Sequence, residues 1–192
     1  MWQYQKKLQV PINIKKSDPK LANYIISQYG GPNGELAASV RYLSQRFSMP
    51  DNVCKGILTD IGTEELAHLE MVGTLVHQLT KNATSAEIEN SPLAQYFVDH
   101  GKGVFPVAAS GPNWDAAYIN VTADPIADMV EDLAAEQKAR AVYENILRVS
   151  DDPDVNNVIK YLRQREIVHF QRFGEALNRL QNKKPNKKVY MS

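Results

Sequence analysis

Residues 58–71 read LTDIGTEELAHLEM, and residues 151–173 read DDPDVNNVIKYLRQREIVHFQRF. Each stretch contains a Glu-x-x-His motif, Glu65 with His68 in the first and Glu166 with His169 in the second. Residues three apart lie on one face of a helix, so each pair can bind a single metal ion. Eleven glutamates and four histidines in 192 residues would give about 0.2 such motifs by chance. The second copy therefore argues against coincidence.

An internal repeat extends this pattern. Glu35 lies thirty residues before Glu65, and Glu136 lies thirty residues before Glu166. The offset between the two halves is 101, and it also relates Tyr42 to Tyr143. The sequence thus predicts two similar halves, each with one lone glutamate and one Glu-x-x-His motif.

Apolar residues at alternating steps of three and four predict four long amphipathic helices. Asn33 and Asp152 are the expected N-caps of the first and last helices, and Pro125 and Pro153 suit the first turns of the last two. The helices are expected from Asn33 or Gly34 to Phe47, from Ser48 to Leu79, from Thr122 or Asp124 to Val149, and from Pro153 to about Leu180.

The connections predict the topology. The first two helices follow one another almost directly, as do the last two, so each pair should form an antiparallel hairpin. About forty residues from Thr80 to Val121 join the hairpins, and one long crossover of this kind is typical of the ferritin-like four-helix bundle. We therefore expect a single all-α domain over residues 1–192. Residues 1–20 should form an extended arm with at most a weak strand, and residues 182–192 a short basic tail.

The two motifs fall in the core-facing rows of their helices, where apolar residues are expected. Buried carboxylates need cations to neutralise them, and four carboxylates match the charge of two divalent ions. Oxygen and imidazole ligands suit manganese or iron, and a chain with Cys54 as its single cysteine offers no thiolate cluster. A lone motif would more often be a surface pair, but the repeated pattern favours a two-metal site.

Several other residues are candidates for a role near this site. Tyr42 and Tyr143 lie two helical turns after their lone glutamates, so each hydroxyl can reach a ligand carboxylate; otherwise both are core aromatics. Arg140 is either a surface charge or a balancing charge for the cluster. His77 and His100 lie outside the repeat and are expected to be structural or exposed.

Composition excludes several classes of protein. Lysine plus arginine and aspartate plus glutamate both number 22, and this balance argues against binding to nucleic acid. The sequence has no apolar run long enough for a membrane span. The first sixteen residues, MWQYQKKLQVPINIKK, lack the apolar segment of a secretory signal, so synthesis in the cytoplasm is expected.

At these residues the chain resembles the manganese catalases, and more closely the short spore-coat branch of that family. The similarity extends over all four predicted helices and includes the first nine residues, MWQYQKKLQ; the remaining matching stretches are YGGPNGELAASVRYLSQR (29–46) and DPIADMVEDLAAEQKARAVYENI (124–146). The resemblance implies that Glu35 and His68 bind one manganese ion, that Glu136 and His169 bind the other, and that Glu65 bridges them. It further implies that Glu166 is a catalytic proton acceptor and that Tyr42 hydrogen-bonds near the cluster.

The resemblance implies disproportionation of hydrogen peroxide by two manganese ions per chain, in a homo-oligomer that would be a hexamer. It also implies a place in the spore coat among other coat proteins, after synthesis in the mother-cell cytoplasm. Trp2, Tyr4 and Leu8 are the apolar arm residues expected to contact a neighbouring subunit. Two alternatives use the same ligands: a di-iron ferroxidase of the bacterioferritin kind, and a structural coat protein whose metal site is not catalytic.

Overall fold

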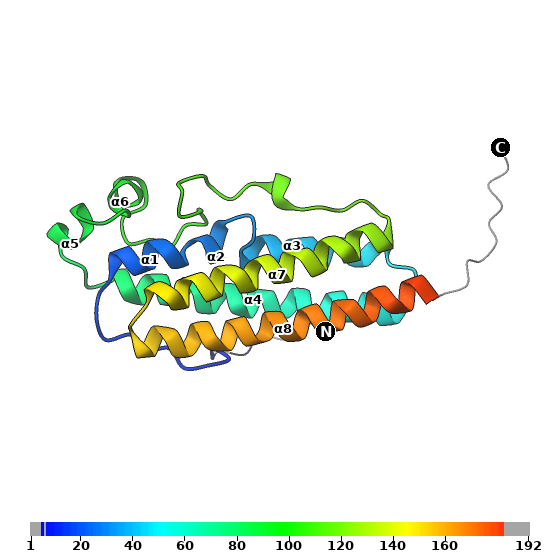
Figure 1. The fold of residues 1–192 in the computed structure, drawn as a ribbon. Coiled ribbons are helices and arrows are strands. Elements are labelled where there is room, and N and C mark those ends of the chain that lie inside the picture. Colours follow the sequence, from blue (N-terminus) through cyan, green and yellow to red (C-terminus); the bar gives the residue numbers. More distant parts are fainter. Residues whose placement is uncertain (1–4, 6, 183–192) are drawn as a thin grey trace.

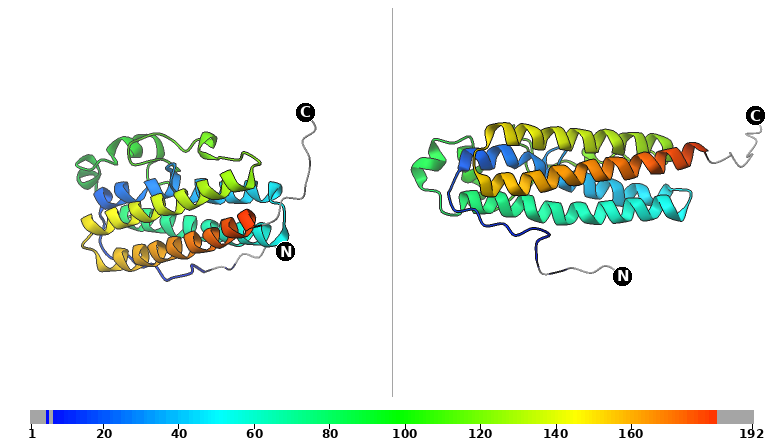
Figure 2. Two further views of the ribbon diagram at one scale, coloured as in Figure 1. Left: turned by 45° about the vertical axis from the view of Figure 1, so that its right-hand side comes forward. Right: turned by 60° about the horizontal axis from the view of Figure 1, so that its bottom comes forward.

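The computed structural model describes Gln5 and residues 7–182; Trp2, Tyr4 and the tail after Asn182 lie outside the described residues. Four long elements dominate this range, and none of its helices combines the length and apolar character of a membrane span. They pack side by side as the predicted ferritin-like bundle (Figures 1 and 2). These elements are α3 (Glu35–Gln45), α4 (Asn52–Thr80), α7 (Pro125–Val149) and α8 (Pro153–Asn182).

Side-chain caps fix where three of these helices begin. Asp51 accepts hydrogen bonds from two backbone amides in the first turn of α4, each at 2.9 Å. A carboxylate here satisfies amides that have no partner within the helix, so α4 begins at Asn52 and the predicted start at Ser48 is wrong. Asp124 caps α7 in the same way, and Asp152 caps α8 as predicted.

A pair of short helices precedes α3, where the sequence analysis placed none. α1 (Pro19–Ile25) and α2 (Ser27–Gly30) lie in line with α3 and pack against α4. Together the three occupy the first position of the bundle as one interrupted helix (Figure 1). α3 begins after Gly34, which takes the N-cap position predicted for Asn33.

The described part of the N-terminal arm lies against its own bundle and contains no strand. Its apolar side chains Leu8, Val10 and Ile12 are half-buried or packed against the main apolar cluster. Gln78 of α4 holds this segment with two hydrogen bonds, one from Ile14 N at 2.7 Å and one to Ile12 O at 2.9 Å. Leu8, which was expected to be exposed for contact with a neighbouring subunit, therefore covers part of the chain's own core and is only partly exposed.

The connection between α4 and α7 runs the length of the bundle, as the long crossover prediction requires (Figure 1). It contains two short helices, α5 (Ser85–Glu89) and α6 (Ala94–His100), and the 3-10 turn η2 (Ala116–Tyr118). The crossover passes so close to Gly30 that a Cβ there would lie 2.1 Å from the carbonyl carbon of Pro106. Only glycine allows this approach.

Buried apolar residues form two clusters, one toward each end of the bundle. The two are separated along the helices by the motif residues: on α4, the first cluster begins at Met71 and the second ends at Ile61. The first cluster includes Ile25, Leu75, Leu79, Tyr143, Val155 and Leu162; the second includes Tyr42, Cys54, Leu58, Met129 and Phe173. The core is thus divided by a polar layer at mid-height.

Candidate metal centre

All six residues predicted as metal ligands or proton acceptor meet in this polar layer. Each of the four bundle helices contributes to it, and none of the six side chains is more than 2% exposed. Glu35 occupies the first turn of α3, where the positive end of the helix dipole favours a carboxylate. The full set is Glu35, Glu65, His68, Glu136, Glu166 and His169.

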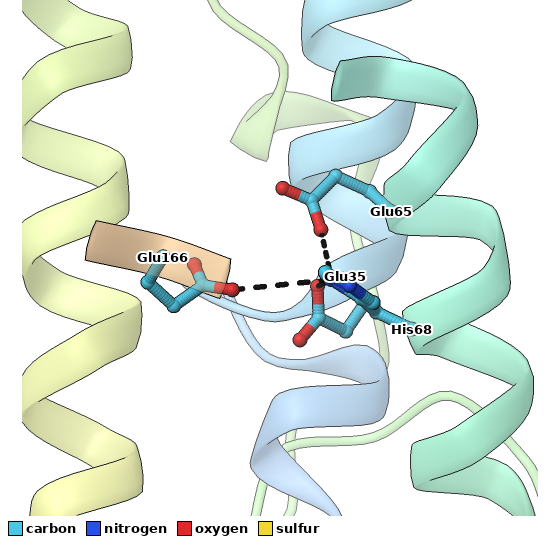
Figure 3. A group of neighbouring side chains, drawn as sticks. All are labelled: Glu35, Glu65, His68 and Glu166. Atoms are coloured by element: carbon cyan, nitrogen blue, oxygen red, sulfur yellow. Dashed lines mark hydrogen bonds and ion pairs between the residues drawn. The ribbon is translucent and has the colours of Figure 1, made fainter. Parts of the chain in front are cut away.

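Within the described residues, these side chains form two overlapping groups whose ligand atoms lie within 4.8 Å of one another. Glu35 and His68 belong to the first group, and Glu136 and His169 belong to the second. Glu65 and Glu166 belong to both. Figure 3 shows the first group, with three carboxylates from different helices directed at the His68 ring.

Both histidines direct Nδ1 into the centre. His68 Nδ1 lies 2.7 Å from Glu65 Oε2, 3.8 Å from Glu35 and 3.9 Å from Glu166. His169 Nδ1 lies 2.9 Å from Glu65 Oε1 and 3.5 Å from Glu136 Oε2. The two carboxylate oxygens of Glu65 thus face one imidazole each, as a bridging ligand requires.

Several buried atoms of this centre make no hydrogen bond. They are Glu65 Oε1, Glu136 Oε2, Glu166 Oε1, His169 Nδ1 and, on the outer side, His68 Nε2. Glu65 Oε1 and His169 Nδ1 approach each other as an ion pair without forming a hydrogen bond. Unpaired buried carboxylates are costly, and they persist where they coordinate metals. Four carboxylates and two imidazoles with converging free atoms fit a pair of divalent cations of the manganese or iron type.

Burial and mutual charge shift the pKa values of this centre. Burial, reinforced by the charge of Glu65, raises the pKa of Glu35 to about 8. Burial lowers the pKa of His169, but the charge of Glu65 and hydrogen bonds with neighbouring glutamates outweigh it and raise that pKa to about 12. Burial also raises the pKa of Glu166 well above its usual range, as do the negative charges around it. Without metal, the centre therefore holds protons in the places where cations fit.

Tyr42 and Tyr143, which the repeat relates, each donate a hydrogen bond to the lone glutamate of the other half of the chain. Tyr42 of α3 donates to Glu136 Oε1 of α7 at 2.6 Å, and Tyr143 of α7 donates to Glu35 of α3. Both rings are fully buried. Each hydroxyl therefore reaches a candidate ligand, as the spacing allowed, and each does so across the bundle.

The structure adds two residues that the sequence analysis missed, Glu64 and Arg165. Glu64 lies on the outer side of both imidazoles, 3.0 Å from His169 Nε2 and 3.6 Å from His68 Nε2. Arg165 donates to both oxygens of Glu64, at 2.7 and 3.0 Å. Positions 64 and 165 are 101 residues apart, which is the offset of the internal repeat. Two opposite charges at equivalent positions were therefore the feature of the sequence that could have predicted this ion pair.

Arg140, His77 and His100 do not join the centre. Arg140 donates to Gln137 at 2.9 Å and lies 3.8 Å from Glu144, with its side chain one-third exposed, so the surface-charge interpretation fits its position. His77 is exposed, and the ring of His100 stacks on Phe105 at 4.2 Å.

Comparison with known proteins connects this geometry to a family. The family model described as "Manganese containing catalase" matches residues 1–191. "Protein CotJC" of Bacillus subtilis is 50% identical over 190 residues, which cover 99% of this chain and 100% of that protein. A "Probable manganese catalase" of Clostridium acetobutylicum is 36% identical, over 97% of this chain and 84% of that protein.

The fold comparison agrees. The crystal structure of KatB, a manganese catalase from Anabaena, has a TM-score of 0.87 to this chain at 33% identity, and the match covers 100% of this chain and 85% of that one. The matched region contains the whole bundle and all six centre residues.

Proposed function

The chain belongs to the manganese catalase family, and from this premise we propose that it disproportionates hydrogen peroxide to water and dioxygen. The observation that carries the proposal is the convergence of four buried carboxylates and two imidazoles with unpaired atoms. A bound pair of manganese ions would supply the reversible change of oxidation state that accepts two electrons from one peroxide and returns them to the next.

The proposed ligand set follows the two groups of side chains. Glu35 and His68 would hold one ion, and Glu136 and His169 the other. Glu65 would bridge the ions, which is supported by the approach of each of its oxygens to a different histidine. Four carboxylates balance the charge of two divalent ions, so the loaded centre would be close to neutral.

Glu166 is the proposed proton acceptor. Oxidation of one peroxide releases protons, and reduction of the next consumes them, so a nearby group must hold a proton between the two halves of the cycle. Glu166 is buried beside both groups of ligands, so its carboxylate would lie within reach of a peroxide held at the metal pair. It would accept the proton from peroxide and later return it.

The proposed setting of this activity is the spore coat. It is supported by the 50% identity to the protein named CotJC, and it implies synthesis in the mother-cell cytoplasm followed by contact with other coat proteins. The family also supports a homo-oligomer, with a hexamer as the expected size. Light scattering of the purified protein measures this, and a monomer would contradict it.

The decisive experiment measures metal content and oxygen release together. The purified protein should contain close to two manganese ions per chain and release oxygen from hydrogen peroxide. Glu65→Ala should lose both ions, because it removes the bridge; Glu131→Ala, at a surface ion pair of α7, is the matched control. Full manganese occupancy in folded Glu65→Ala would refute the ligand assignment. Iron as the dominant metal would favour a di-iron ferroxidase, and bound manganese without oxygen release would favour a structural coat protein.

A further inference from the structure

Glu64 occupies a position that the proposed reaction does not use. Its carboxylate lies between the Nε2 atoms of His68 and His169, on the side facing away from the other glutamates. The two imidazole rings are nearly parallel, with centroids 5.6 Å apart and planes inclined by 22°. One carboxylate therefore lies beside both rings: it is within hydrogen-bond distance of His169 Nε2, at 3.0 Å, and it is the ion-pair neighbour of His68 Nε2, at 3.6 Å, an atom that has no hydrogen-bond partner.

Two features fix this carboxylate in place. Arg165 of α8 binds it through two nitrogens, and a planar guanidinium paired with both oxygens defines its orientation. Glu64 also lines a surface groove of about 1100 Å³ between α4 and the N-terminal arm, and its side chain is 16% exposed. The arrangement thus joins a solvent-facing ion pair to two fully buried imidazoles.

We propose that Glu64 is a positioning residue shared by both histidines, so that this one carboxylate supports both metal subsites at once. A histidine that binds metal through one nitrogen commonly donates the other N–H to a carboxylate, which fixes the ring and strengthens the ligand. Here Nδ1 of both rings faces the candidate ligands, which leaves both Nε2 atoms for Glu64. The inference rests on the metal assignment of the proposed function.

A manganese-binding titration of the metal-free full-length protein tests this inference, with free Mn²⁺ followed by its electron paramagnetic resonance signal. Glu64→Gln keeps the shape of the side chain but removes its charge. Loss of such an outer carboxylate typically weakens metal binding about 10–100-fold, and we expect both ions to be affected together. Unchanged affinity, or loss of one ion alone, would overturn the shared role.

A matched control distinguishes positioning of the two histidines from an ion pair that merely connects α4 to α8. Arg172 and Asp60 form another ion pair between α8 and α4, at 3.1 Å, one helical turn before Glu64 and away from both imidazoles. Asp60→Asn should bind both ions with affinity within about threefold of wild type, because no histidine depends on it. An equal loss in Asp60→Asn and Glu64→Gln would overturn the inference.

A charge exchange provides the rescue. Positions 64 and 165 are equivalent in the repeat, so the double variant Glu64→Arg/Arg165→Glu places a carboxylate on α8 beside the same two rings. We expect it to bind both ions within about tenfold of wild type, as an outer carboxylate is again present. If Glu64→Gln does not fold, this variant decides alone: a folded exchange variant that binds one ion or none overturns the inference.

The titration requires no peroxide. Wild-type protein that binds two ions without releasing oxygen would refute the proposed activity and leave the role of Glu64 standing. Wild-type protein that binds no manganese would refute both.

Discussion

Tyr42 donates its hydrogen bond to Glu136, on the opposite hairpin, at 2.6 Å. Tyr143, the equivalent residue of the second half, donates a hydrogen bond to Glu35 on the first hairpin. The two hairpins are therefore joined through their candidate ligands as well as through apolar packing. Burial is the main reason that the pKa values of both tyrosines are raised well above the usual range, and the nearby glutamates add to it. Both hydroxyls thus remain donors throughout the physiological range.

This exchanged pairing predicts a specific coupling. Tyr42→Phe should lower the free energy of unfolding by about 1–3 kcal/mol, because it leaves a buried carboxylate oxygen without its donor. In a double-mutant cycle, Tyr42→Phe combined with Glu136→Gln should show a coupling energy of about 0.5–3 kcal/mol. The same change combined with Glu35→Gln should be additive to within about 0.5 kcal/mol. Urea unfolding of the metal-free proteins measures both cycles, and the reverse result would show that the tyrosine serves its own hairpin.

The second prediction separates a base from a ligand. Glu166→Gln should keep both manganese ions and lose catalase activity by a factor of about 10²–10⁴, the usual worth of a positioned general base. Glu175→Gln, an exposed position on the same helix, should change neither quantity. Metal analysis and oxygen release are measured on the same samples. If Glu166→Gln loses one ion, the side chain is a ligand, and the centre resembles a symmetric di-iron site.

The third prediction concerns pH. The folded, metal-free chain holds protons on Glu35, with a pKa of about 8, and on His169, with a pKa of about 12. The pKa of His68 is also well above its usual value: burial lowers it, but the charge of Glu65 and neighbouring carboxylates outweigh that effect. A metal ion must displace these protons, so manganese affinity should rise with pH. Near neutral pH, about two to three protons should be released per chain.

Calorimetric titrations in two buffers of different ionisation enthalpy measure that release, and heats that do not depend on the buffer would contradict it.

The same pKa shifts affect the stability of the metal-free fold. Because the folded pKa of His169 lies above that of the unfolded chain, its contribution to stability is complete below about pH 6.5. That contribution is then lost as the pH rises toward about 12.

The fourth prediction concerns the arm. Gln78→Ala removes both hydrogen bonds that hold residues 12–14 against α4, and at about 1 kcal/mol each it should lower the free energy of unfolding by about 1–2 kcal/mol. Manganese content should not change, because the centre lies elsewhere in the bundle. Gln164→Ala, at an exposed position on α8, is the control. Equal stability of the two variants would show that the arm contributes nothing to the fold of its own chain.

Periodicity and the repeat were sufficient to predict the bundle and the six centre residues. Helices of eleven to thirty residues carry enough turns for their buried face to be read from the sequence. Glu65, His68, Glu166 and His169 stood out because they interrupt apolar rows. The ligand types then followed from the need to neutralise buried carboxylates.

The features that were missed depend on contacts distant in sequence. α1 and α2 are too short for a periodic signal, and Gly30 is required by the backbone of the crossover, about seventy-six residues later. The spacing of the tyrosines allowed each to reach a ligand carboxylate or to be a plain core aromatic, and which carboxylate each one meets depends on how the hairpins pack. Glu64 was missed because it is partly exposed and sits beside a more conspicuous glutamate.

The division of the core by a polar layer has a consequence for cooperativity. The apolar clusters toward the two ends of the bundle share α4, α7 and α8, but without a cation the residues between them are held together only by protons and leave buried atoms without a hydrogen bond. Chelation should therefore loosen the middle of the bundle first and let its two ends open as separate units in hydrogen exchange. Binding of the ions would couple the two ends, so that the whole bundle unfolds in one cooperative step and the reactive centre also stabilises the fold.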